Sequence, residues 1–309
     1  MQIHRSFETL NNIKNPVVTT GTFDGVHIGH KVIIDRLNTL AKNITGESVL
    51  ITFHPHPRRV LYPETAGKNL QLINSQKEKI HLLEKAGLNH LVIIDFTIEF
   101  SKTTSRQFVE EILLGKLHAK IIIVGFNHHF GHNREGDYSY LYELTKTHLF
   151  QVEEIPEQDL ENETVSSTII RKALSEGRIQ RANAYLDHFF IITGSLTKGD
   201  EKCSQIGFTT MGVIIEEDVK LIPPDGVYAI SLNIEKKRFR GMLNVKHYST
   251  NKPNIQVHLF NLDDVNDLIN KEVTVAFHKH MRDELQLDST KNLKSQLEKD
   301  KLEIEELIY

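Results

Sequence analysis

Two histidines three residues apart follow a glycine-containing turn near the N-terminus. Residues 21–30 read Gly-Thr-Phe-Asp-Gly-Val-His-Ile-Gly-His, so His27 and His30 would share one face of a helix that begins near Gly29. The N-terminus of such a helix attracts phosphate, and imidazole N–H groups can stabilise the charge on a leaving pyrophosphate. The pattern therefore indicates a nucleotide site. A structural turn with solvated histidines and a pair of metal ligands are the alternatives.

A strand before these histidines and a helix after them must position the turn. The strand is expected over 17–20 and the helix over 29–41, where apolar residues recur at helical spacing. Strand and helix patterns alternate to residue 155, with further strands expected at 48–53, 91–94, 120–124 and 151–155 and helices at 75–86, 104–114 and 138–147. This alternation predicts an α/β domain with a parallel sheet covered on both faces, in which ligands bind at the carboxyl ends of the strands.

Two further motifs directly follow predicted strands. Residues 53–57 read Phe-His-Pro-His-Pro, in which two prolines stiffen a loop and Phe53 offers an aromatic face. Residues 124–136 combine glycines and aromatic side chains with Arg134, a composition that suits a flat ring with a phosphate nearby. For the first of these loops a rigid surface turn is the alternative.

A fourth motif, at 165–174, reads Val-Ser-Ser-Thr-Ile-Ile-Arg-Lys-Ala-Leu. Ser166 or Ser167 suits a helix N-cap, which places Arg171 one turn inside the helix. Hydroxyl groups, free amides and a guanidinium together make a second anion site. A capped helix with a solvated arginine is the alternative.

The four motifs, in this order, resemble those of HxGH nucleotidyltransferases, and the long first motif resembles that of the bacterial bifunctional riboflavin kinase/FMN adenylyltransferases (FAD synthetases). The resemblance implies a doubly wound parallel-sheet domain over 1–185 that transfers AMP from ATP, with Mg²⁺, to FMN and releases FAD. It implies catalysis by His27, His30 and Arg171. It implies ATP binding by Gly21, Thr22, Phe23, Asp24, Gly25, Ser166, Ser167 and Thr168. It implies flavin or nucleotide loops that contain Phe53, Pro55, His56, Pro57, Gly125, Asn127, Phe130 and Arg134. Asn127 replaces the aspartate usual in the family, which leaves an ionic or metal role there open.

The second half of the chain changes character. Short β-rich runs separated by turn residues are expected at 189–196, 208–215, 227–233, 238–245, 256–260 and 272–277. Such spacing predicts a small antiparallel β-barrel over 186–309. The tail from Ser289, with an apolar stripe of Leu293, Leu297 and Leu302, is expected to close the barrel as a helix.

This half resembles the riboflavin kinase module of the same family, which phosphorylates riboflavin from MgATP. Remnants of the module's motifs are Gly207, Thr210, Asn244, Gln256, Arg282 and Glu284. Gly212 stands where the family has a metal-binding asparagine, and Gln256 replaces the glutamate that acts as general base. These losses predict that the kinase activity is weak or lost. The alternatives are a fully bifunctional enzyme, with Asp200 or Glu201 taking over, and a flavin-binding regulatory module.

Composition bounds these interpretations. The 309 residues suffice for two domains, and a net charge of −4 gives no electrostatic case for nucleic acid. There is no apolar run of about 18 residues and no signal-peptide pattern, so no membrane partner is expected. The single cysteine fits a cytoplasmic protein. An HxGH adenylyl- or cytidylyltransferase with an acceptor other than FMN remains the enzyme alternative.

Overall fold

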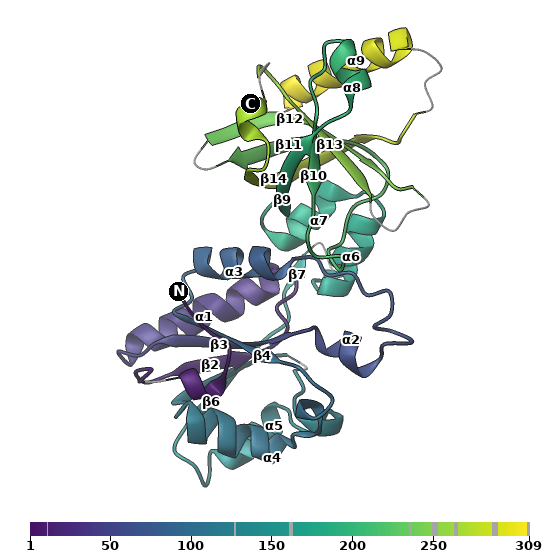
Figure 1. Cartoon of the computed structure of the whole chain (residues 1–309). Coiled ribbons are helices and arrows are strands. Elements are labelled where there is room, and N and C mark those ends of the chain that lie inside the picture. The colour runs from purple at the N-terminus through teal and green to yellow at the C-terminus, as the bar shows by residue number, and fades with distance from the viewer. Residues whose placement is uncertain are drawn as a thin grey trace. The chain divides into compact units, whose positions relative to one another are not determined.

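The chain forms two compact units (Figure 1), as seen in a computed structural model. The first unit comprises Met1–Leu70 and Lys79–Ser166, and the second comprises Gln71–Glu78 and Ser167–Tyr309. The structure describes residues 1–10, 12–126, 128–160, 163–234, 237–248, 253–262, 265–285 and 290–307, apart from the side chains of Thr9, Glu201 and Lys202. A domain boundary between residues 185 and 186 stays a prediction.

The first unit is built on a six-stranded parallel sheet in the order β1-β4-β3-β2-β5-β6. Its strands are β1 (Gln2–His4), β2 (Val17–Thr20), β3 (Ser48–His54), β4 (His90–Asp95), β5 (Ile121–Gly125) and β6 (Gln151–Ile155). The predicted parallel sheet is confirmed. The edge strand β1 was not predicted, because three residues are too few to show a strand period.

Helices cover both faces of this sheet, as Figure 1 shows. On one face, α1 (Ile28–Asn43) and α3 (Gln76–Lys85) enclose one apolar core, into which α1 buries Ile34, Leu37 and Ala41. On the other face, α4 (Ser105–Gln107), the π-helix η3 (Phe108–Lys116) and α5 (Tyr138–Leu144) enclose a second core. The remaining elements are η1 (Phe7–Thr9), α2 (Pro57–Leu61), η2 (Phe100–Lys102), η4 (His132–Arg134), β7 (Asp159–Leu160) and β8 (Glu163–Thr164).

Two predicted helix ends in this unit are wrong. The helix expected to stop before Gly115 continues through it to Lys116 as a π-helix. A Cβ atom on Gly115 would lie 3.0 Å from the carbonyl oxygen of Glu110, so glycine here allows close backbone packing rather than a stop. Helix α5 ends at Leu144, three residues early, and backbone bonds from Thr145, Lys146 and Thr147 form the closing turns.

The second unit contains a closed six-stranded antiparallel barrel in the order β10-β13-β12-β11-β14-β9, which confirms the predicted architecture. The strands are β9 (Phe190–Lys198), β10 (Met211–Ile214), β11 (Gly226–Ile234), β12 (Lys237–Lys246), β13 (Asn254–Leu259) and β14 (Glu272–Arg282). The helices are α6 (Ser167–Ser175), α7 (Ile179–Leu186), α8 (Glu201–Gln205), η5 (Asn266–Leu268) and α9 (Thr290–Leu307).

Helix α9 packs on the barrel as the predicted closing helix, but with a different face. Leu297 and the fully buried Ile304 join an apolar cluster with Phe208 and Met242. Leu302, expected in the buried stripe, is 64% exposed. The buried positions at 297 and 304 are seven residues apart, or about two helical turns, whereas 302 points away from that line. Ser289, the expected start of this helix, lies outside the described residues.

A segment from the first half of the chain belongs to the second unit. Leu72 N donates to Val219 O at 2.7 Å, and Leu221 N donates to Leu72 O at 2.8 Å. The ammonium group of Lys220 lies 2.8 Å from the Glu78 carboxylate, and both side chains are fully buried. The unit boundary therefore falls inside α3, between Glu78 and Lys79.

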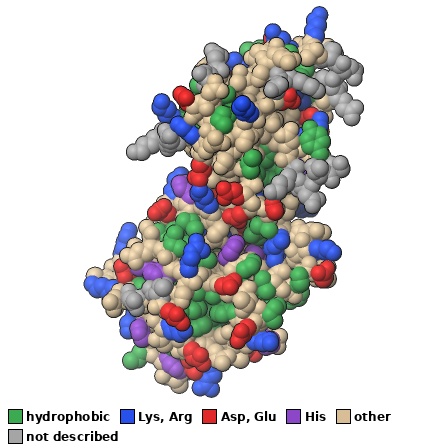
Figure 2. All heavy atoms as spheres, in the orientation of Figure 1, with side chains coloured by type: hydrophobic (Ala, Val, Ile, Leu, Met, Phe, Trp, Pro, Cys, Tyr) green, Lys and Arg blue, Asp and Glu red, His purple; other side chains and the backbone are tan. Residues whose placement is uncertain are grey.

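On the face shown in Figure 2, basic and acidic side chains are interspersed rather than gathered by sign. Within the described part of the chain, no helix is long and apolar enough to cross a membrane.

Candidate functional site

The glycine-containing turn joins the carboxyl end of β2 to the start of α1, as predicted. Its backbone is strained: Phe23 and Val26 adopt φ angles of 47° and 43°, beside Gly25 at 94°. A β-branched residue at positive φ is rare and costs about 1–3 kcal/mol. Both strained side chains are at most 3% exposed and pack into the core beneath α1. Burial therefore holds the turn in a shape that the isolated peptide would not keep.

The two histidines meet at the N-terminus of α1, which confirms that they share one face. His27 is the N-cap residue, and its ring stacks on His30 with centroids 3.6 Å apart. The other face of His30 stacks on Phe23, with centroids 4.5 Å apart. Held between two rings, His30 keeps one orientation without a hydrogen bond, and its buried Nδ1 has no partner among the described residues.

Lys79, which sequence reasoning missed, braces this turn from α3. Its ammonium group donates to the carbonyl oxygen of Thr22 at 2.8 Å, and the Thr52 hydroxyl donates to the same oxygen at 3.2 Å. Lys79 is only 4% exposed. Burial of His30, with added repulsion from His27 and Lys79, lowers the pKa of His30 well below its usual value. The imidazole is therefore neutral at pH 7 in the free protein.

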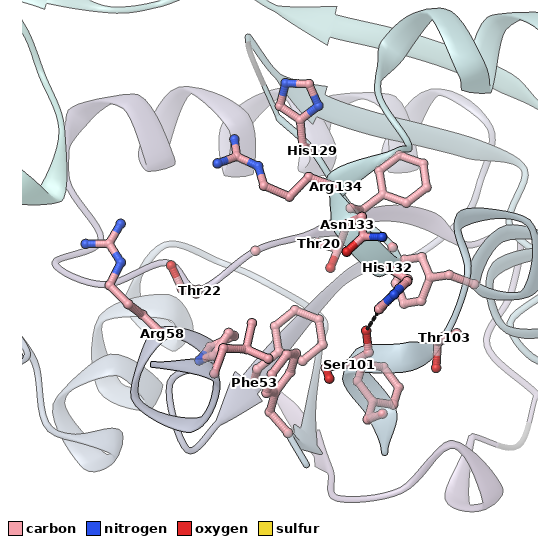
Figure 3. Close-up of a pocket in the computed structure, with 18 of the residues that line it drawn as sticks. Thr20, Thr22, Phe53, Arg58, Ser101, Thr103, His129, His132, Asn133 and Arg134 are labelled. Carbon is pink, nitrogen blue, oxygen red and sulfur yellow. Dashed lines mark hydrogen bonds between the residues drawn. The ribbon is translucent and has the colours of Figure 1, made fainter. Parts of the chain in front are cut away.

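A pocket of about 640 Å³ opens at the carboxyl ends of the strands beside this turn (Figure 3). This location agrees with the rule for open α/β sheets. The lining residues are Thr20, Gly21, Thr22, Phe53, His56, Pro57, Arg58, Leu61, Tyr62, Phe96, Phe100, Ser101, Thr103, Phe108, His128, His129, Phe130, Gly131, His132, Asn133 and Arg134. Aromatic rings dominate one part of the lining, and none of these described residues is acidic. The pocket suits a flat aromatic ligand that carries negative charge.

The pocket gathers several predicted residues: Gly21, Thr22, Phe53, His56, Pro57, Phe130 and Arg134. The first motif's Phe23, Asp24 and Gly25 are buried beside it, whereas Pro55 and Gly125 are not in its lining. Asn127 lies outside the described residues. Arg58 and His128 line the pocket but were not predicted, because a single arginine after a proline-rich loop and one histidine among several carry no distinctive spacing.

The second predicted anion site falls at the start of α6. Ser167, Thr168 and Arg171 lie in the first turns of this helix, and Ser166 directly precedes it. The predicted helix start is confirmed. Ser166 ends the first unit and Ser167 begins the residues assigned to the second. The contribution of Arg171 to the histidine site stays a prediction.

His128 makes the first unit sensitive to acid. Burial, with smaller effects of His129 and Arg134, lowers the pKa of His128 to about 4 from the usual 6.5. Because the unfolded chain binds this proton more tightly, the free energy of unfolding is highest above pH 6.5 and falls as the pH drops toward 4. When the pH falls from 8 to 5, we expect protonation of His128 alone to lower the free energy of unfolding by about 2 kcal/mol. Urea unfolding of the wild type and of His128→Phe measures this, and equal losses in both proteins would contradict it.

In the second unit, three positions of the predicted kinase motifs pair with one another across neighbouring strands. Gln256 on β13 pairs with Gly212 on β10 and with Asn244 on β12. A Cβ atom on Gly212 would lie 3.6 Å from Gln256 Nε2 and 2.5 Å from the Thr197 hydroxyl. The two positions predicted from the resemblance to have lost a metal ligand and a general base are thus adjacent, and they carry glycine and glutamine. The Thr197 hydroxyl now fills the space where a longer side chain at 212 would begin.

The other residues predicted to be remnants of the kinase motifs form hydrogen bonds or ion pairs within the second unit, apart from Gly207. Glu284 accepts hydrogen bonds from Asn244 at 3.0 Å and from Lys246 at 3.1 Å. Arg282 forms an ion pair of 2.6 Å with Asp300 of α9. Thr210 accepts a bond from the Asp200 amide at 3.0 Å, and Gly207 has a φ of 88°. The described residues contain no group of three or more His, Cys, Asp or Glu side chains that could hold a metal ion.

Comparison with known families matches both halves of the chain. A model described as FAD synthetase matches residues 10–169, and a model described as riboflavin kinase matches residues 186–308. A bifunctional riboflavin kinase/FMN adenylyltransferase from Buchnera aphidicola subsp. Schizaphis graminum is 32% identical over 97% of this chain and 96% of its own. Its counterpart from Listeria monocytogenes is 29% identical over 93% of this chain and 90% of its own.

A solved structure shares the fold of the chain. The structure, titled as a macrolide-efflux protein from Streptococcus pneumoniae, has a TM-score of 0.87 and 25% sequence identity, and the match covers 97% of both chains.

Proposed function

We propose that this chain makes FAD at the histidine-bearing end of its first unit and that its riboflavin kinase activity is weak or lost. The chain belongs to the family of bifunctional riboflavin kinase/FMN adenylyltransferases and is an FMN adenylyltransferase. The proposal that the first unit makes FAD rests on the stacked pair His27 and His30 at the N-terminus of α1. The substrates are ATP, as its Mg²⁺ complex, and FMN.

In the proposed reaction, a phosphate oxygen of FMN attacks the α-phosphorus of ATP. A new P–O bond forms, the bond to the bridging oxygen breaks, and pyrophosphate leaves with the bonding electron pair. The attacking phosphate is already anionic, so no protein base is required. The protein's part is to align the two phosphates and to stabilise the charge on the leaving group. His27, His30 and Arg171 take the second role, with Gly21–Gly25, Ser166, Ser167 and Thr168 holding the nucleotide.

The weak-kinase proposal rests on the row that Gly212, Gln256 and Asn244 form. Glycine offers no ligand to Mg²⁺, and an amide cannot remove the proton of the riboflavin hydroxyl near neutral pH. Loss of a general base alone costs about 10²–10⁴-fold in rate. For riboflavin kinase activity to be kept, other residues would have to supply a Mg²⁺ ligand and a general base next to Gly212 and Gln256.

Full-length protein with MgATP tests both parts, with FMN in one reaction and riboflavin in another, and with products separated by chromatography. We expect FAD from FMN, and FMN from riboflavin at least about 100 times more slowly. Rates within tenfold of each other would overturn the kinase proposal. If nicotinamide mononucleotide or phosphopantetheine were adenylylated and FMN were not, the proposed acceptor would be wrong.

A further inference from the structure

The lining of the pocket in the first unit is unusual in charge. The chain carries 41 acidic and 37 basic residues, yet none of the described residues that line this pocket is Asp or Glu. The lining instead contains Arg58 and Arg134 together with His56, His128, His129 and His132. A site without carboxylates and with two permanent cations attracts an anion.

Among the described residues, the guanidinium groups of Arg58 and Arg134 form no hydrogen bond and no ion pair. For both residues the hydrogen bonds run through the main chain: Arg58 N donates to His56 Nδ1 at 3.1 Å, and Arg134 N donates to Gly131 O at 3.1 Å. In the described part of the chain, neither guanidinium lies within 4.0 Å of a carboxylate. By contrast, Arg106 pairs with Glu110 at 3.0 Å.

The backbone places the two arginines on separate walls of the pocket. Arg58 lies in α2, whose N-terminus is capped by the His56 side chain. Arg134 and its neighbour Asn133 have φ angles of 60° and 52°, a backbone conformation that residues other than glycine adopt at a cost in free energy. In Figure 3 the side chains of Arg58 and Arg134 end on the side of the view where Thr22 and His129 lie, whereas Ser101 lies on the opposite side.

We propose that Arg58 and Arg134 recognise the phosphate of the acceptor and so set the preference for FMN over riboflavin. This inference rests on the proposed function. A phosphate monoester carries a charge of about −1.5 to −2 near pH 7, whereas riboflavin ends in a neutral hydroxyl at the same position. Planar guanidinium groups make paired, charge-assisted hydrogen bonds with phosphate oxygens. The aromatic part of the lining, around Phe53, Phe96 and Phe100, then receives the ring system that both flavins share.

Steady-state FAD formation by full-length protein tests this, because it reports on adenylyl transfer to FMN and not on the phosphorylation of riboflavin. The variants are Arg58→Gln, Arg134→Gln and the double substitution. The control is Arg106→Gln, an exposed arginine outside the pocket. The measured quantities are KM for FMN, KM for ATP, and Ki for riboflavin as a competitor of FMN.

In the double variant we expect KM for FMN to rise at least about 100-fold, because two bonds to a charged phosphate are lost and each is worth about tenfold or more. Ki for riboflavin should stay within about twofold and KM for ATP within about threefold of wild type. Lysine at both positions should recover part of the FMN affinity, because the charge remains.

Three results would overturn the inference while FAD formation itself stands. The first is an unchanged KM for FMN. The second is an equal rise in KM for FMN and Ki for riboflavin, which would make the arginines structural. The third is a rise in KM for ATP alone, which would assign them to the triphosphate. If the wild type forms no FAD, the proposed function fails instead. Calorimetric titration with FMN and with riboflavin then tests the arginines separately, with FMN binding alone expected to depend on them.

Discussion

Replacing His30 with asparagine is expected to lower kcat for FAD formation about 100- to 1,000-fold, because removal of one fixed donor to transition-state charge has this size. The imidazole is held between the rings of His27 and Phe23, so its donor is aimed before the substrates arrive. Asparagine keeps a polar group but is too short to reach the same point. KM for FMN should change little, since His30 is not among the residues that line the pocket proposed to bind FMN.

The matched control is His81→Asn, the same substitution at an exposed position of α3, with an expected change in kcat below twofold. His27→Asn should resemble His30→Asn, and the double variant should lose less than the product of the two single effects, since both histidines act on one developing charge. A loss below tenfold in His30→Asn, with wild-type stability, would remove the histidine pair from the chemistry.

Much of the fold follows from local patterns in the chain. Alternating strand and helix periods predicted the parallel sheet, and short strands at regular spacing predicted the barrel, because each pattern records which side of an element is buried. The turn before His27 was predictable for the same reason: glycines lie between a β-branched run and a helical stripe. What such patterns leave open is the partner of each buried face.

The residues that escaped prediction depend on contacts between distant parts of the chain. Lys79 reads as one more lysine in a charged helix, and its role appears only when Thr22 lies beside it. Leu302 fits an apolar stripe, but the barrel surface selects Leu297 and Ile304. Arg58 is distinguished because none of the described residues that line its pocket is acidic, and no local pattern reports the composition of a pocket whose lining comes from distant parts of the chain.

Glu78 and Lys220 form a fully buried ion pair in the second unit. Lys220→Met is expected to lower the free energy of unfolding of the second unit by about 3–5 kcal/mol, the usual result of removing one partner of a buried pair. Lys220 Nζ also donates to the carbonyl oxygens of Ile191, at 2.7 Å, and Ile73, and it lies 4.3 Å from the centroid of the Phe190 ring. The substitution leaves these oxygens and the Glu78 carboxylate buried without the ammonium group.

Lys77→Met on the same segment is the matched control. Lys77 also pairs with a glutamate, Glu272, but these side chains are 61% and 56% exposed. Surface pairs of this kind contribute about 0–1 kcal/mol. Urea unfolding of full-length protein, followed by a signal from the barrel, should therefore separate the two lysines by at least about 2 kcal/mol. Equal effects would show that burial does not set the strength of the Lys220 pair.

Glu78→Gln tests the same pair from the other side. The amides of Thr193 and Ser75 donate to different oxygens of Glu78, at 2.7 Å and 2.9 Å, so glutamine, with one carbonyl oxygen, can keep only one of these bonds. The substitution also leaves the lysine charge without its counter-ion. We expect a loss close to that of Lys220→Met. The double variant should lose clearly less than the sum, because no buried charge is then left unpaired. Additive losses would mean that the two side chains stabilise the unit independently. The coupling would also show that a fragment starting at residue 186 lacks part of its own core, since Gln71–Glu78 supplies the partner of Lys220.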